Sequence, residues 1–142
     1  MMKFIFLIMS LLFHGTGFSQ TSNIDITISE IKNKKGLIRV SLFTQDDGFP
    51  NNHEKAFRSI SMEITESQLN FNIEDLPTGE YALAVLHDEN ENGKMDFNFL
   101  RMPKEGYGVS NNAKSSFGPP KYKDAKFLLS TDDLPLKITM NY

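Results

Sequence analysis

An acidic segment near the middle of the chain has the residue types and spacing of a cation-binding loop. Residues 88–96 place oxygen-bearing side chains at the first, third, fifth and ninth positions and a glycine at the sixth, as calcium loops do. Alternate side chains converge when such a chain curls, and calcium prefers several oxygen ligands at short range. The segment therefore predicts a calcium site with these ligands: Asp88, Asn90, Asn92, the backbone carbonyl of Lys94, and Asp96.

Two features separate this segment from a complete helix-loop-helix calcium hand. Position twelve is Phe99, where such a hand has a bidentate glutamate, and the residues before the segment read as a strand. The site would need a further oxygen from Asn98, Glu105 or Asp124, and its calcium affinity would be weak. Magnesium suits it less without phosphate partners. The alternative is a solvated acidic turn in which Asn92-Gly93 fits a tight hairpin.

The sequence carries no standard catalytic motif. His14, His53 and His87 lack the local spacing of zinc ligands, and the chain has no cysteine. No serine stands in a Gly-x-Ser-x-Gly elbow, and no glycine-rich phosphate loop is present. His87 has the chemistry of a general base that Asp88 or Asp96 could orient, and its alternative role is a hydrogen-bonded histidine at a sheet edge. We therefore expect a protein that is not an enzyme.

Aromatic and amide side chains gather between residues 107 and 122. Exposed aromatic rings stack on sugars or peptides, and amides beside them supply polar contacts. The alternative is that the rings fill a small satellite core that keeps a long loop ordered. The candidate ligand-binding residues are Tyr107, Asn111, Asn112, Phe117 and Tyr122.

Alternation of apolar and polar residues predicts the strands that position these side chains. Residues 23–31 and 37–43 alternate on either side of turn-forming residues 33–36, which predicts a hairpin. Residues 68–73 alternate in the same way. Residues 80–87 are apolar on both faces, as expected of a central strand, and they lead directly into the acidic segment.

The second half of the chain has less regular patterning. Residues 97–126 are rich in Gly, Pro, Asn, Ser and Lys without a sustained period, which predicts a long loop. Residues 127–130 and 136–142 supply the last strands. About seven short strands with no convincing long helix predict an all-β fold, an antiparallel β-sandwich of immunoglobulin-like or transthyretin-like kind.

The N-terminal residues have the pattern of a secretory signal peptide. Lys3 precedes an apolar stretch from Phe4 to Phe13, and Gly17 and Ser19 stand three residues and one residue before a possible cut ahead of Gln20. The apolar stretch is too short for a stable membrane anchor, and no second hydrophobic run follows. We expect removal of residues 1–19 and one exported domain over residues 20–142, periplasmic or extracellular, without a membrane span.

Composition excludes one kind of stabiliser and argues against one class of partner. The absence of cysteine rules out a disulfide framework, so a hydrophobic core must hold the domain together. The formal net charge of −3 gives no electrostatic reason to expect nucleic acid as a partner.

Several segments of the second half carry a recognisable pattern. They are residues 81–90, 92–96, 103–108, 110–113, 117–120 and 124–125. Together they resemble the signature of a bacterial family called domain of unknown function 2141. The resemblance implies a small exported β-sandwich of bacteria, and it supplies no catalytic residues because the family has no assigned activity. The chain departs from the family's expected pattern at Glu91, where a glycine would follow Asn90.

Three hypotheses about function follow from these patterns. The first is a non-catalytic binding module of the cell envelope, whose calcium-organised loop presents a surface to a glycan, a peptide or an envelope protein. The second is a structural or assembly subunit of the envelope that needs no metal. The third is a metal-assisted hydrolase that uses His87, Asp88, Asp96 and Glu105.

Overall fold

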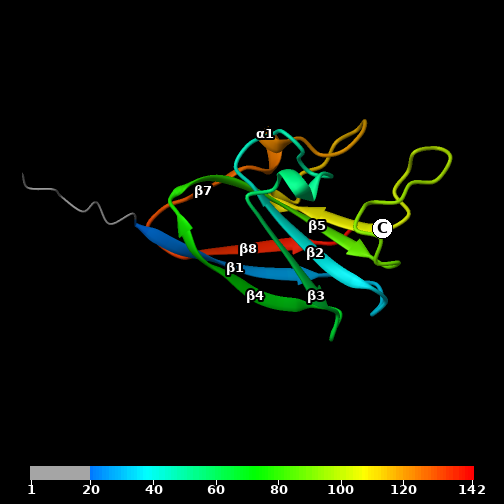
Figure 1. The fold of residues 1–142 in the computed structure, drawn as a ribbon, viewed down its shortest axis with the longest axis horizontal. Helices are drawn as coiled ribbons and strands as arrows, with labels where there is room; N and C mark the ends of the chain where they lie inside the picture. The colour runs from blue at the N-terminus through cyan, green and yellow to red at the C-terminus, as the bar shows by residue number, and fades with distance from the viewer. Residues whose placement is uncertain (1–19) are drawn as a thin grey trace, which may run out of the picture.

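The structure, a computed structural model, describes residues 20–142. The predicted signal peptide, residues 1–19, lies outside the described residues. Eight strands and three short helical turns make up the fold (Figure 1). The strands are β1 (Thr21–Ser29), β2 (Leu37–Phe43), β3 (Arg58–Glu63), β4 (Leu69–Pro77), β5 (Gly79–Asp88), β6 (Gly106–Val109), β7 (Phe127–Leu129) and β8 (Leu134–Thr139). The helical turns are η1 (His53–Lys55), η2 (Ser110–Asn112) and α1 (Tyr122–Ala125).

The strands form two sheets, which confirms the predicted all-β sandwich. One sheet has three strands in the order β4-β1-β8, and the other has five, in the order β3-β2-β5-β6 with β7 paired to the first residues of β5. The pairing of β1 with β8 is parallel, and the other strand pairs are antiparallel. Within residues 20–142, no helix is long and apolar enough to cross a bilayer.

The main core lies between the two sheets and follows from strand alternation. Ile24, Ile26 and Ile28 of β1 are almost fully buried because every second side chain of that strand points inward. The other sheet contributes apolar side chains such as Val40 and Leu83 to the same buried cluster. Each fully buried aliphatic side chain contributes about 1.5 to 3 kcal/mol of hydrophobic stabilisation.

The predicted hairpin between the first two strands is wrong. β1 pairs with β4 and β8, whereas β2 pairs with β3 and β5 in the other sheet. The chain leaves β1 through Glu30, whose φ is +63°, and the N–H of Ile31 donates to the carbonyl of Ser67. Residues 33–36 therefore lie in the connection that carries the chain from one sheet to the other, and they do not close a hairpin.

The predicted long loop over residues 97–126 is also only partly correct, because it contains β6, η2 and α1. β6 is a four-residue strand in which two glycines hide the alternation. Gly108 is required by packing, since a Cβ there would lie 2.6 Å from Cγ2 of Ile138 in the facing sheet. Because this close approach requires glycine, β6 lacks the side-chain alternation from which a strand is predicted.

The outer face of the five-stranded sheet is covered as well. A second buried cluster contains Phe43, Ala82, Ala84, Val109 and Ala125, and Phe49 and Tyr122 pack against it. This explains why β5 is apolar on both faces, as the sequence predicted for a central strand. The covering layer consists of loops, and these loops build the candidate site.

Candidate functional site

The acidic segment begins where β5 ends, and Asp88 fixes its start. The side chain of Asp88 has no exposed surface. Oδ1 accepts the N–H of Asn92 at 3.1 Å, and Oδ2 accepts the N–H of Gly93 at 2.9 Å. Oδ2 also accepts a charged hydrogen bond from Nε of Arg39 on β2. Asp88 therefore links the loop to the five-stranded sheet.

The loop curls so that the side chains of its third, fifth and ninth positions meet. Nδ2 of Asn90 lies 2.7 Å from Oδ2 of Asp96, and Nδ2 of Asn92 lies 3.0 Å from the same oxygen. The amide oxygens of the two asparagines accept backbone N–H groups of the loop itself. Gly93, with φ of +82°, supplies the left-handed bend that was predicted for the sixth position.

Glu105 closes the base of the loop. Its carboxylate is buried, and its two oxygens accept the N–H groups of Glu89 at 3.0 Å and Asp96 at 3.1 Å. Among the three suggested sources of an extra oxygen, Glu105 is the one whose hydrogen bonds reach the loop. Asn98 instead holds a separate turn by accepting the N–H groups of Leu100 and Met102.

His87 faces away from the acidic loop. Its imidazole is fully buried, with Nε2 2.8 Å from the carbonyl oxygen of Lys35 and Nδ1 2.7 Å from Oη of Tyr142. Because a carbonyl only accepts, Nε2 carries the proton and Nδ1 accepts the phenol O–H. Both ring nitrogens are thus committed to the fold, and Asp88 binds Arg39 instead of orienting this histidine.

Residues 20–142 contain no group of three or more His, Cys, Asp or Glu side chains arranged to hold a metal ion. A cation in the acidic loop would therefore depend on asparagine and backbone oxygens as well as on carboxylates. The sequence predicted Asp88 and Asp96 as the two acids of such a set. The oxygens of Asp88 are bonded to Arg39 and to two backbone N–H groups, whereas Asp96 is turned toward the two asparagines.

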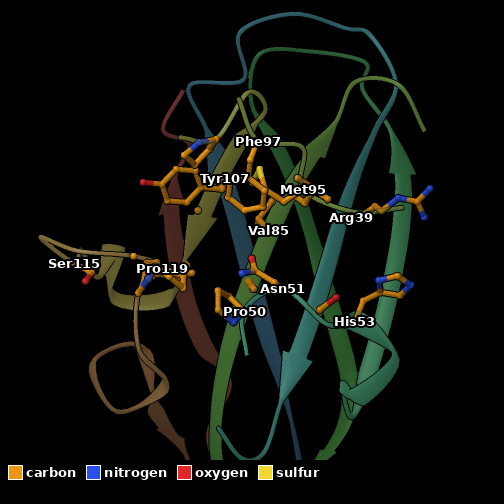
Figure 2. A pocket seen from close by; sticks show the side chains of 18 of the residues that line it. Arg39, Pro50, Asn51, His53, Val85, Met95, Phe97, Tyr107, Ser115 and Pro119 are labelled. Atoms are coloured by element: carbon orange, nitrogen blue, oxygen red, sulfur yellow. The ribbon is translucent and has the colours of Figure 1, made fainter. Parts of the chain in front are cut away.

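A pocket of about 390 Å³ lies over the outer face of the five-stranded sheet, between the loops that cover it (Figure 2). Figure 2 shows Arg39 and His53 on one side and Tyr107 and Phe97 on the other. The apolar lining includes Met95, Phe97, Met102, Tyr107, Pro119 and Pro120, and the polar lining includes Arg39, Ser41, Asn51 and His53.

The acidic loop forms part of the pocket wall. Gly93 and Met95 both line the pocket, and a Cβ at Gly93 would lie 4.0 Å from Cε1 of His53. Met95, which the sequence placed at the eighth position of the loop, is half-buried. The order of the loop and the shape of the pocket are consequently linked.

The five candidate ligand-binding residues fall into two groups in the structure. Tyr107 lines the pocket, and Phe117 stands beside it, 93% exposed, between lining residues Ser116 and Gly118. The other three residues support the fold. Asn111 donates to the carbonyl of Lys126 at 2.9 Å, Asn112 accepts the N–H of Thr139 at 2.8 Å, and the ring of Tyr122 packs edge-on against Phe49 at 5.8 Å.

Several lining residues were not predicted from the sequence to contact a ligand, among them Arg39, Asn51, His53 and Met102. They come from a strand and two loops that are distant in sequence, so no local spacing marks them. Arg39 carried the one available signal, because it is the one charged residue of β2. A charge at such a position needs a partner, which here is Asp88.

Comparisons with known proteins give one family and one distant structural likeness. The family described as "Uncharacterized protein conserved in bacteria (DUF2141)" matches residues 26–137. The solved structure of a pilus-presented adhesin, Spy0125 (Cpa), is 14% identical, with a TM-score of 0.37 over 88% of this chain and 27% of the adhesin chain. The chain thus spans about a quarter of that adhesin's length. No curated protein matches the chain.

Proposed function

Because the chain belongs to the DUF2141 family of uncharacterised bacterial proteins, which brings no assigned reaction, we propose a function from the geometry of the site. The protein is an exported, non-catalytic binding module of the cell envelope. It holds its ligand in the pocket above the five-stranded sheet. A calcium ion in the acidic loop stabilises one wall of that pocket.

The pocket is the observation that carries this proposal. Its volume of about 390 Å³ falls in the range of small-ligand sites, and its lining combines a large apolar part with a few polar groups. Met95, Met102 and Pro119 offer no side-chain hydrogen-bond donors. This lining favours an apolar side chain of a peptide over a glycan, with Asn51 and His53 as polar contacts.

The described pocket lining contains no aspartate or glutamate, which supports a binding role. Catalysis by water activation needs a base that reaches the substrate. His87 is buried and bonded at both ring nitrogens, and the carboxylate of Asp88 is enclosed by Arg39 and two backbone N–H groups. None of the four residues of the hydrolase hypothesis, which also include Asp96 and Glu105, belongs to the pocket lining.

The proposal of a calcium ion rests on the convergence of three side chains of the acidic loop. The side chains of Asn90 and Asn92 both meet one carboxylate oxygen of Asp96. An ion at this point would require the two amide oxygens to turn toward it, and their present hydrogen bonds from backbone N–H groups of the loop would then be exchanged for bonds to the ion. Asp96 is the acid that faces this point, because Asp88 is bonded to Arg39 and to two backbone N–H groups. With so few charged ligands, the affinity belongs to the weak range of extracellular calcium modules, about 0.1 to 1 mM.

Peptide display and glycan arrays probed with the processed protein test the ligand class. The expected result is selection of peptides with an apolar residue, with binding lost in Ser116→Trp because the indole fills the pocket. Thr131→Trp, an exposed position before β8, is the matched control and should retain binding. Selection of glycans alone would refute the proposal that the ligand is a peptide. Peptide binding that survives Ser116→Trp would refute the proposal that the peptide binds in the pocket.

A melting experiment tests the ion. At ten times the dissociation constant, calcium should stabilise the protein by about 1.4 kcal/mol relative to excess chelator, which is a rise of several degrees in Tm. Asp96→Asn should abolish the rise, and Asp132→Asn, an exposed acid elsewhere, should preserve it. No rise in the wild type would leave a plain acidic turn and favour the metal-free envelope subunit.

A further inference from the structure

Two loops beside the pocket carry most of the exposed large apolar side chains of residues 20–142. The loops are residues 97–104 and residues 114–123. They contain five of the eight large hydrophobic residues that are exposed in the described chain. These five are Phe97, Phe99, Leu100, Met102 and Phe117, and both Phe99 and Phe117 are 93% exposed.

The exposure of the first loop is enforced by its backbone. The N–H of Asn98 donates to the carbonyl of Met102, and the side-chain oxygen of Asn98 accepts the N–H groups of Leu100 and Met102. Phe97 and Pro103 form an antiparallel bridge below this turn. The turn therefore holds Phe99 and Leu100 at its tip, where both side chains are exposed.

The same two loops are basic on an acidic protein. They contain Arg101, Lys104, Lys114, Lys121 and Lys123 and no acidic residue, whereas the formal net charge of the whole chain is −3. Residues from both loops line one pocket, among them Arg101 and Met102 of the first and Ser116 and Pro119 of the second, so the two loops meet at the same pocket. Figure 1 shows the two loops extending past the strands on the side opposite β4.

We propose that these two loops form a docking surface for an anionic lipid bilayer. Bulky apolar side chains at a tip partition into the headgroup and acyl boundary, and lysine and arginine around them attract anionic lipids. Lysine and arginine also extend their charged ends to the interface while their stems cover apolar surface. A bilayer satisfies both components at once, because it offers an apolar layer beneath a layer of negative charge.

The docking is peripheral and reversible, and it is independent of the pocket ligand. The contact uses a few side chains on two loops, so its strength depends on salt and on lipid charge. The bilayer would also set the orientation of the protein, with the pocket mouth close to the membrane surface. This surface goes beyond the proposed binding function, and either can fail without the other.

A single tryptophan reports the docking directly, because the chain contains none. Phe99→Trp places the reporter at the loop tip, and Leu128→Trp places it at another exposed apolar position, on β7. Vesicles with one third phosphatidylglycerol in phosphatidylcholine should shift the emission of Phe99→Trp to the blue and expose it to quenching by brominated lipid. Leu128→Trp should show neither change. The absence of both changes in Phe99→Trp would overturn the proposal.

Vesicle sedimentation with the processed protein separates the two components of the surface. Arg101→Glu with Lys104→Glu should lower the partition coefficient at least tenfold, and Phe99→Ser with Leu100→Ser should do the same. All four side chains are exposed, so far-ultraviolet circular dichroism of both variants should match the wild type. Equal binding to vesicles of pure phosphatidylcholine, or binding unchanged in either variant, would overturn the proposal.

Discussion

Arg39 on β2 donates from Nε to Oδ2 of Asp88, the last residue of β5. The carboxylate has no exposed surface, whereas 26% of the arginine side chain remains exposed. A second nitrogen of Arg39 donates to Oγ of Ser61 on β3. One ion pair thus connects the start of the acidic loop to two other strands of the sheet.

We expect Asp88→Ala to destabilise the protein strongly. The change removes the acceptor of two backbone N–H groups and leaves Arg39 without its buried counter-charge. Breaking a buried pair in this way costs about 3 to 5 kcal/mol. Urea unfolding measures the loss, and Asp47→Ala is the control, because its pair with Lys55 is exposed and should contribute about 1 kcal/mol or less.

Glu105→Gln should loosen the acidic loop without unfolding the sandwich. The amide has one accepting oxygen where the carboxylate has two, so one of the N–H groups of Glu89 and Asp96 loses its partner. An unsatisfied buried donor costs about 1 to 3 kcal/mol. Hydrogen exchange should accelerate in residues 89–96. Exchange rates unchanged from wild type would show that the Glu105 carboxylate does not hold the loop in place. Glu91→Gln, at an exposed position, is the matched control.

Asp88 and Arg39 show which contacts could not be predicted from the sequence. The spacing from Asp88 to Asp96 predicted the curl of the loop correctly, because neighbouring residues make that curl. The spacing also predicted that Asp88 would face an ion, and it gave no sign of Arg39, which lies far away in the sequence. Side-chain alternation likewise identified β1 and β2 as strands but assigned the wrong partner to each. Pairing depends on contacts between distant residues, which a local pattern does not contain.

Gly36→Ala and Gly118→Ala should differ greatly in cost. Both glycines have positive φ, +65° and +76°, so both substitutions strain the backbone by about 1 to 2 kcal/mol. At Gly36 the added Cβ would overlap the backbone oxygen of Asp88, whereas nothing lies within 4 Å at Gly118. Urea unfolding should show the larger loss at Gly36, and equal losses would refute the close approach.

Tyr142 should make stability fall at high pH. Burial, and to a lesser extent the charge of Glu89, raises the pKa of the Tyr142 phenol above its ordinary value of 10.0, while a hydrogen bond from Lys32 opposes the rise. Folding therefore favours the protonated phenol, whose contribution is complete below pH 10 and is lost as the pH rises through the raised pKa.

The Tyr142→Phe variant isolates this contribution. It should lose about 1 kcal/mol at neutral pH, because the phenol bonds to His87 and Lys32 disappear. Above about pH 10 its urea midpoint should fall less steeply than that of the wild type. Burial also raises the pKa values of Tyr81 and Tyr122, and both residues are present in each protein, so their effects cancel in the comparison. Parallel pH profiles would contradict the prediction.

The parallel pairing of β1 with β8 has a consequence for the order of synthesis. The ribosome delivers β1 among the first residues of the described chain, and its apolar side chains Ile24, Ile26 and Ile28 then have no complete sheet to join. The missing neighbour, residues 134–139, emerges more than a hundred residues later. Closing such a long loop carries an entropic cost, which slows folding. The three-stranded sheet therefore stays incomplete until residues 134–139 have been made.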